Sequence, residues 1–204
     1  VYASSSSVYG DSKDLPKIEH SIGKPLSPYA ITKLTNELYA KNFSELYSIE
    51  TVGLRYFNVF GKRQDPSGDY AAVIPKWVNS LLNQQPIFVH GDGKTSRDFC
   101  FIHNVVQVNI LSAINKGKNI SEVYNVACGQ QTSLNDLINI LKMNIYGTQD
   151  DLQDKVSVFY KDFRKGDVRH SLADISKAID QLNYNPNYDI QSGIKLYIEW
   201  FKEK

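Results

Sequence analysis

Ser27-Pro28-Tyr29-Ala30-Ile31-Thr32-Lys33 is the most informative stretch of this chain of 204 residues. Ser27 is a typical N-cap and Pro28 suits the first helical position, so a helix is expected to begin here. On that helix Tyr29 and Lys33 lie one turn apart on the same face. An ammonium beside a phenol favours the phenolate, which is the form that acts as a general base. The stretch therefore predicts both a helix and a proton-transfer pair.

The context of this helix adds a third group. Ser4 to Ser7 stand at the end of an expected buried strand, residues 1–5, and a loop punctuated by proline and glycine leads from them to the helix. Residues 51–58 are dense in β-forming residues, and strand, helix and strand in this order predict a βαβ unit of a parallel sheet. One of these serines, together with Tyr29 and Lys33, then forms a candidate proton relay. The alternatives are serines that only satisfy main-chain groups and a helix-surface Tyr-Lys pair.

The composition is that of an ordinary globular protein, with 42% hydrophobic and 22% charged residues. A net charge of +1 and the lack of a basic block give no electrostatic reason to expect nucleic acid or an anionic membrane as a partner. No apolar run approaches the ~18 residues of a membrane span. Cys100 and Cys128 stand in apolar contexts without metal-binding spacing. We therefore expect buried thiols, no metal site and a reducing cytoplasm.

Turn residues and apolar periodicity divide the chain into alternating strands and helices. The expected strands are residues 1–5, 51–58, 86–90, 95–101, 123–127 and 156–160. The expected helices are residues 28–47, 74–83, 105–115, 134–145, 175–182 and 190–202. N-caps are expected at Ser133 and Asp174. Residues 61–70, a candidate loop over a site, and residues 149–154 are polar and predict loops.

Six segments in order resemble the extended short-chain dehydrogenase/reductases, and among them the UDP-N-acetylglucosamine/galactosamine 4-epimerases of bacterial surface-polysaccharide synthesis. These segments are residues 4–11, 27–33, 54–61, 71–77, 91–99 and 164–171. Each motif alone is weak, but the ordered set covers nearly the whole chain. The resemblance implies an α/β fold, made of the C-terminal part of a Rossmann-like doubly wound parallel sheet and a smaller α/β substrate-binding domain.

One part of the family pattern is missing. Its members open with a βαβ unit whose glycine-rich turn holds the dinucleotide pyrophosphate at a helix N-terminus. No such turn occurs here, and the chain begins without methionine inside an expected strand. We therefore expect the C-terminal portion of a longer enzyme, inactive by itself and without tight NAD binding. The alternative is a natural cofactor-free protein.

The resemblance also implies domain limits. Residues 1–62 are expected to belong to the NAD-binding Rossmann domain and residues 63–204 mainly to a UDP-sugar-binding domain. Residues 95–127 could return to the Rossmann domain. For the full-length enzyme the family pattern implies a homodimer.

The cofactor of the resembled family is NAD, and its reactive end implies roles for four residues. Ser5 is the expected catalytic hydroxyl, Tyr29 the base, and Lys33 a ligand of both the tyrosinate and the nicotinamide ribose. Tyr56 would lie beside the nicotinamide, although an aromatic residue in a buried strand needs no such role.

A UDP-sugar carries a diphosphate, which needs cations and amides. Asn58, Arg97 and Arg164 are the expected diphosphate ligands, because arginine binds phosphate bidentately. Asp167 could accept hydrogen bonds from hydroxyls. The alternative for either arginine is a surface ion pair with a neighbouring Asp98 or Asp162.

The uracil needs flat apolar contacts, which are expected from Ala72, Val73, Trp77 and Phe88. Phe88 and His90 stand where relatives often carry Tyr and Asn, which leaves the uracil contacts open. His103 is expected to pack or to cap a helix, and no catalytic role is expected for it.

The sugar ring is expected to contact serine side chains. The resemblance implies that Ser6 and Ser7 lie near the substituent at C2. Ser171 would border the same substituent, and its small size would leave room for an N-acetyl group. The alternative for Ser171 is an ordinary serine ahead of a helix.

The expected function is the reversible, NAD-dependent C4 epimerisation of UDP-N-acetylglucosamine and UDP-N-acetylgalactosamine. In the mechanism that the family implies, Tyr29 removes the C4 hydroxyl proton as hydride passes to NAD, and the 4-keto sugar turns over before hydride returns. The rivals are a UDP-glucose 4-epimerase, a nucleotide-sugar 4,6-dehydratase or a decarboxylase on the same scaffold. Dehydratases carry Asp-Glu where this chain has Ser6 and Ser7, which disfavours dehydration. A rival of another class is a noncatalytic UDP-sugar-binding module.

Overall fold

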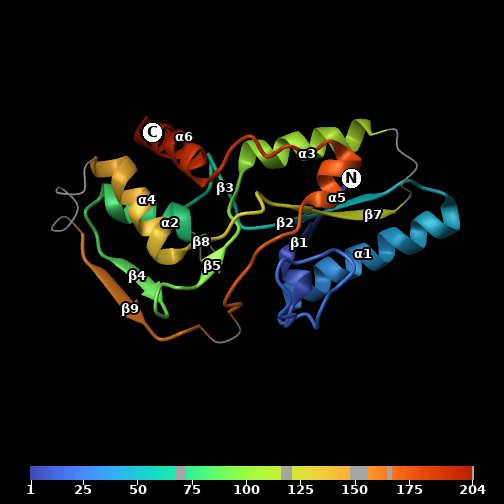
Figure 1. Ribbon diagram of the computed structural model, residues 1–204, viewed down its shortest axis with the longest axis horizontal. Coiled ribbons are helices and arrows are strands. Elements are labelled where there is room, and N and C mark those ends of the chain that lie inside the picture. Colours follow the sequence, from blue (N-terminus) through green and yellow to red (C-terminus); the bar gives the residue numbers. More distant parts are fainter. Residues whose placement is uncertain (68–71, 116–120, 148–155, 165–166, 204) are drawn as a thin grey trace.

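The computed structural model describes residues 1–67, 72–115, 121–147, 156–164 and 167–203. Two groups of elements follow each other along the long axis of the molecule (Figure 1). The first holds β1 (Tyr2–Ser5), the 3-10 helix η1 (Ser6–Tyr9), α1 (Pro28–Tyr47), β2 (Val52–Tyr56), α3 (Ile102–Ile114), β7 (Glu122–Val126) and α5 (Ser176–Leu182). The second holds α2 (Val73–Leu82), β4 (Ile87–His90), α4 (Leu134–Tyr146), β9 (Val158–Lys161) and α6 (Ile190–Lys202). This α/β architecture confirms the expected fold class.

A parallel sheet of order β1-β2-β7 forms the centre of the first group. Ser5 is the register partner of Tyr56, which in turn pairs with Val126. All three residues are the last of their strands, so the carboxyl ends of the strands meet at one edge of the sheet. This register brings Ser5 and Tyr56 next to each other, as expected for a parallel βαβ unit.

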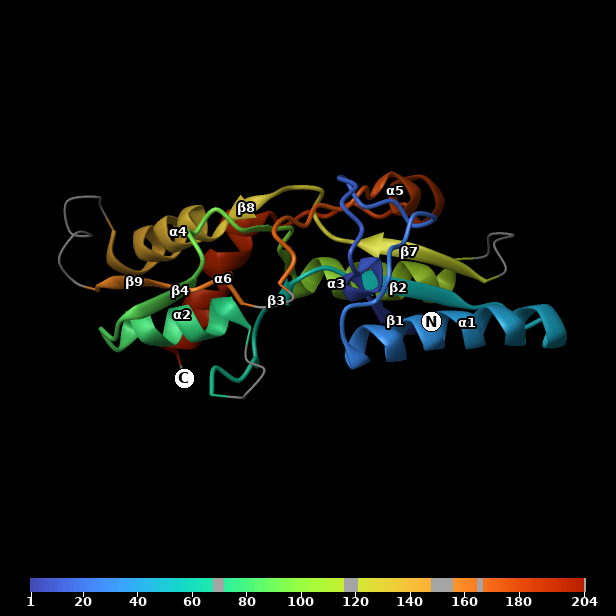
Figure 2. The ribbon, with the colours of Figure 1, turned by 90° about the horizontal axis from the view of Figure 1, so that it is seen from below.

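The two faces of this sheet have different coverings, because successive residues of a strand point to opposite faces. Leu54 packs with Val105 of α3 and Ala178 of α5 in one buried cluster. The next residue, Arg55, pairs with Glu37 of α1. Figures 1 and 2 both show the strands between α1 on one side and α5 on the other. The layers are therefore helix, sheet and helix.

Helix α1 begins where the sequence predicts, since Ser27 accepts from the Ala30 amide at 3.1 Å and Pro28 is the first helical residue. Its buried residues are Ala30, Glu37 and Ser44, spaced seven apart. Of the large apolar residues that predict this helix, Leu34 is half-buried and packs against a core cluster. The others are exposed: Ile31, Leu38, Tyr39, Phe43, Leu46 and Tyr47. The apolar spacing thus identifies the helix but not the face that packs on the sheet.

The second group has its own core between three helices and the parallel pair of β4 and β9. Its fully or nearly fully buried side chains include Trp77, Val78, Leu81, Ile87, Leu137, Leu141, Ile194 and Tyr197. Phe60 and Phe101, from the segments that join the groups, pack into the same core. The domain limits expected at residues 62 and 63 stay a prediction.

Two expected strands are wrong in detail. Residues 95–101 form two short strands in different sheets, β5 (Ser96–Arg97) with β8 (Thr132–Ser133) and β6 (Cys100–Phe101) with β3 (Val59–Phe60). The strand expected at residues 51–58 ends at Tyr56. Asn58, two residues later, takes φ +34°, a left-handed conformation that asparagine tolerates and that does not continue a strand.

The helix ends differ as well. Helix α3 starts at Ile102, three residues before the expected start, and its N-cap Phe101 has no side-chain cap. Asp174 stands one residue before the N-cap of α5, which is Ile175, although its carboxylate accepts from the Ser176 amide at 2.8 Å. The expected loop at 149–154 lies outside the described residues, as does the end of the loop at 61–70.

Within the described ranges, no helix has the length and apolar character that crossing a membrane requires. The same residues contain no group of three or more His, Cys, Asp or Glu side chains that could hold a metal ion. Both cysteines are free; Cys100 is buried and Cys128 is half-buried.

Candidate active site

The Tyr-Lys pair lies at the start of α1, beside the carboxyl end of β1. The Lys33 ammonium donates to the Ala3 carbonyl at 3.2 Å and stands 5.5 Å from the centre of the Tyr29 ring. The Tyr29 side chain is 56% exposed, so its phenol is open to a ligand. The structure thus brings the expected phenol and ammonium together through the first turns of one helix.

The third member of the expected triad is engaged locally. The Ser5 hydroxyl accepts from the Ser7 amide at 3.1 Å and caps the 3-10 helix η1. Within the described chain no hydrogen bond joins Ser5 to the Tyr29 phenol. The Ser5 hydroxyl can still donate to a ligand, because accepting one bond leaves its proton free. Its place in a relay stays a prediction.

A buried ion pair holds α1, the helix that carries Tyr29 and Lys33, against the sheet, and the sequence reading missed it. Arg55 on β2 binds Glu37 on α1 through two bonds of 2.9 and 2.7 Å, and it donates to the Glu19 carbonyl at 2.8 Å. Ser4, the neighbour of Ser5, donates to the same Glu37 carboxylate. Burial alone would lower the pKa of Arg55, but the bonds to Glu37 raise it. Glu37 thus ties α1 to both β1 and β2.

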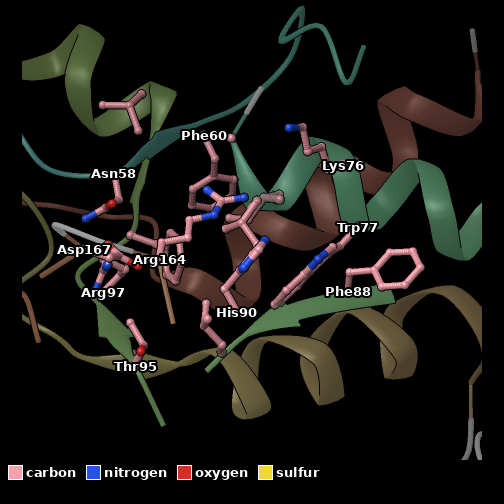
Figure 3. Close-up of a pocket in the computed structure, with 16 residues that line it drawn as sticks. Asn58, Phe60, Lys76, Trp77, Phe88, His90, Thr95, Arg97, Arg164 and Asp167 are labelled. Atoms are coloured by element: carbon pink, nitrogen blue, oxygen red, sulfur yellow. Dashed lines mark hydrogen bonds and ion pairs between the residues drawn. The ribbon is translucent and has the colours of Figure 1, made fainter. Parts of the chain in front are cut away.

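The larger cavity of the site, about 290 Å³, is lined by α2 and β4 of the second group and by the segments around Asn58 and Arg97 that join the groups. All eight residues expected to bind UDP line it: Asn58, Ala72, Val73, Trp77, Phe88, Arg97, Arg164 and Asp167. Figure 3 shows Arg97, Asp167 and Arg164 gathered at one end, with Trp77 and Phe88 at the other. The cavity is therefore polar and cationic at one end and aromatic at the other.

A smaller cavity of about 220 Å³ adjoins the larger one. Asn58, Arg97 and Asp167 line both cavities, so they mark the junction. The expected sugar residues Ser6, Ser7 and Ser171 line the smaller cavity. The Ser7 hydroxyl is buried and has no partner in the part of the chain that the structure describes. A buried hydroxyl without a partner is costly, so a polar ligand would be favoured here.

The junction is held by Arg97 and its neighbour Asp98. Arg97 forms an ion pair of 2.6 Å with Asp167, which corrects the alternative of a pair with Asp98. Asp98 points the other way and accepts from the amides of Cys128, Gly129 and Ala173 at 2.9, 3.0 and 3.2 Å. Burial raises the pKa of Asp98 to about 6, against the effect of these amides. Asp98 therefore fixes the main chain behind Arg97.

The structure also adds lysines that the sequence reading missed. Lys76 lies in the larger cavity, one residue before Trp77. His90, which the sequence places near the uracil contacts, lines the same cavity near Trp77 (Figure 3). Lys17 lines the smaller cavity and is buried; burial lowers its pKa, although Asp14 opposes this. His103 packs between Phe101 and Tyr188, as expected for a packed histidine.

Comparison with known proteins gives one family. The model of the GDP-mannose 4,6 dehydratase family matches residues 1–197. A putative UDP-glucose 4-epimerase of Methanocaldococcus jannaschii is 38% identical over 203 residues, which are 99% of this chain and 62% of the relative.

Two solved structures extend this similarity. UDP-N-acetylglucosamine 4-epimerase from Methanobrevibacter ruminantium, in complex with UDP-N-acetylmuramic acid, matches with a TM-score of 0.90 and 39% identity over 99% of this chain and 62% of that chain. UDP-glucuronic acid 4-epimerase from Bacillus cereus, in complex with UDP-glucuronic acid and NAD, matches with a TM-score of 0.86 and 30% identity over 98% and 60%. The chain thus spans less than two thirds of the length of each of these proteins.

Proposed function

Because the chain belongs to the GDP-mannose 4,6-dehydratase family of the extended short-chain dehydrogenase/reductases, we propose that it supplies the catalytic pair and UDP-sugar site of an NAD-dependent 4-epimerase. Its substrates are UDP-N-acetylglucosamine and UDP-N-acetylgalactosamine, and its products serve surface-polysaccharide synthesis. The isolated chain is expected to bind the UDP-sugar without turning it over.

The observation that carries the proposal is the pair of adjoining cavities. A UDP-sugar has an aromatic base, a diphosphate and a sugar in this order. The aromatic end with Trp77 and Phe88, the junction at Arg97 and the serine-lined smaller cavity follow the same order. Cationic and amide groups at the middle of the path suit the diphosphate.

The residues present also fit the reactive end of NAD. Tyr29 is exposed, and the Lys33 ammonium lies 5.5 Å from the centre of its ring. Tyr56 is the last residue of the neighbouring strand β2. A phenol and an ammonium are suitable donors for ribose hydroxyls. When bound, NAD would supply the acceptor and donor for the hydride at C4. No glycine-rich pyrophosphate turn occurs in the sequence, so tight NAD binding by this chain alone is not expected.

The proposed proton chemistry uses the chain's own residues. Tyr29 takes the C4 hydroxyl proton and later returns it, and Lys33 stabilises the tyrosinate. Ser5 donates to the reacting oxygen. The buried Glu37–Arg55 pair holds α1 against the strands and keeps these groups in place.

Support for an N-acetylated sugar comes from the smaller cavity. Ser171 is 9% exposed and lines it together with Ser6 and Ser7. Hydroxyls at Ser6 and Ser7, in place of carboxylates, disfavour the dehydratase alternative. The UDP-glucose alternative differs in the space required at C2.

Ser171→Tyr is expected to lower the affinity for UDP-N-acetylglucosamine at least tenfold, since the larger side chain fills the space for the acetamido group. UDP-glucose, which lacks that group, should keep its affinity within about twofold. Calorimetry with both ligands measures the ratio, and Ser176→Tyr on the exposed start of α5 is the control. A parallel loss for both sugars would make Ser171 a structural residue.

We also propose that the full-length enzyme is a homodimer. The exposed apolar face of α1, with ring contacts of 6.5 Å between Tyr39 and Phe43 and 5.4 Å between Phe43 and Tyr47, supports an interface there.

The direct test of the reaction uses a chimera. The part of the Methanocaldococcus relative that has no counterpart in this chain would be joined to residues 1–204. Proton NMR should then show interconversion of the two UDP-N-acetylhexosamines when NAD is present. A chimera that binds NAD and UDP-N-acetylglucosamine but leaves the sugar unchanged would favour the noncatalytic binding module.

A further inference from the structure

An ion pair stands at the junction of the two cavities. Arg97 Nη2 donates to the Asp167 carboxylate at 2.6 Å, and Nη1 donates to the main-chain carbonyls of Ser96 and Arg169 at 2.9 and 3.4 Å. Asp167 is 43% exposed, whereas Arg97 is 15% exposed. The carboxylate is therefore the partner of Arg97 that lies toward the solvent and the cavities.

On the proposed function, this ion pair lies where an anionic part of the ligand would bind. The diphosphate of a UDP-sugar joins the nucleoside to the sugar and would lie at the junction, where Arg97 and Asp167 line both cavities. The Asp167 carboxylate already accepts from Nη2 of Arg97 at this junction. A phosphate oxygen that bound to the same guanidinium would lie close to this carboxylate, and the two negative charges would repel each other.

We propose that Asp167 is an internal anion of the site, which holds Arg97 when no ligand is bound and which the diphosphate must displace. In this role Asp167 lowers the affinity for every anionic ligand at the junction. A residue that only accepts from ligand hydroxyls would raise the affinity for UDP and leave the affinity for pyrophosphate, which has no ribose hydroxyls, unchanged. The effect of removing the Asp167 charge on the two probes therefore separates the two roles.

The main chain around Asp167 allows this exchange without a large movement. Ser96 accepts from the Ser171 amide at 3.1 Å and donates its own amide to the Arg169 carbonyl at 3.1 Å. Arg169 also forms an ion pair of 2.6 Å with Asp92. These bonds hold the backbone after Asp167 in place, so rotation of the Asp167 side chain is enough to release Arg97.

Affinity measurements on residues 1–204 test the proposal, with inorganic pyrophosphate and UDP as the probes. Pyrophosphate has no base and no hydroxyls of a ribose, so it reports only on the charged junction. Asp167→Asn should bind pyrophosphate about fivefold more tightly than the unchanged chain. Asp167→Glu, which keeps the charge, should stay within about twofold of the unchanged chain.

Asp162→Asn is the matched control, because it removes one negative charge from the preceding segment, where the Asp162 main-chain carbonyl lies 3.2 Å from His90 Nδ1. It should change pyrophosphate affinity less than twofold. Equal or weaker pyrophosphate binding by Asp167→Asn would overturn the proposal, as would an equal gain in Asp162→Asn. If UDP binds the unchanged chain and these variants alike, only this inference fails. If neither UDP nor pyrophosphate binds the unchanged chain, the proposed function fails with it.

Discussion

Replacing Tyr29 by phenylalanine is expected to lower the epimerisation rate of the NAD-loaded chimera by about 10²- to 10⁴-fold, because the reaction loses its general base. The affinity for UDP should change little, since the proposed UDP contacts come from the larger cavity, which Tyr29 does not line. Proton NMR of the sugar interconversion measures the rate, and calorimetry measures the affinity.

Tyr39→Phe is the matched control for this variant. Tyr39 lies on the same helix, is also exposed, and keeps its ring contact with Phe43 when only the hydroxyl is removed. It should retain nearly full activity. A Tyr29→Phe enzyme with nearly unchanged turnover would remove Tyr29 from the chemistry, whatever the binding data say.

Replacing Glu37 by alanine is expected to lower the free energy of unfolding by about 3 to 5 kcal/mol, because it leaves the Arg55 charge buried without its partner. The two side chains are 8% and 4% exposed, so water cannot replace the lost carboxylate. Urea unfolding of residues 1–204 measures the difference. Ser4 loses its acceptor in the same variant, which adds to the effect.

Two further variants make this result specific. Glu45→Ala on the exposed side of α1 should change the stability by less than about 0.5 kcal/mol. The double variant Glu37→Met with Arg55→Met should recover most of the loss, since apolar replacement of both partners removes the unpaired charge. A loss in Glu37→Ala no larger than in Glu45→Ala would show that the pair contributes little.

Local signals made several elements predictable from the sequence. Ser27 with Pro28 and Ser133 mark helix starts through bonds to amides only three residues away. Such bonds depend on nearby residues alone, so their pattern is readable. The alternation of strands and helices likewise predicted the parallel sheet, which the register of β1, β2 and β7 confirms.

The errors lie where distant contacts decide the structure. Residues 95–101 read as one strand, but the Asp98 carboxylate binds amides of residues 128, 129 and 173 and interrupts it. Helix α3 starts after Phe101, whose burial replaces the polar cap that a sequence reading looks for. The fully buried residues of α1, Ala30, Glu37 and Ser44, are small or polar, and Glu37 is buried because it pairs with the buried Arg55.

In the candidate site, too, residues within a pattern were predictable and isolated residues were not. The eight residues expected to bind UDP could be named because their motifs follow the family pattern in order, and the structure places all eight around one cavity. Lys76 and Lys17 escaped notice, since a lone lysine carries no pattern until the fold places it beside a cavity. Glu37 could have been found, because it lies one turn after Lys33 on the same face and Arg55 stands alone in an apolar strand.

Saturation-transfer NMR of UDP-N-acetylglucosamine with residues 1–204 tests the central claim most directly, that the two cavities hold one UDP-sugar. Saturation is expected on the uracil protons, from Trp77 and Phe88, and on the acetyl methyl protons, from the cavity that Ser7 and Ser171 line. Arg97→Met should weaken both signals together by removing the diphosphate ligand at the junction. Absence of saturation with the unchanged chain, or equal saturation with Arg97→Met, would contradict the account.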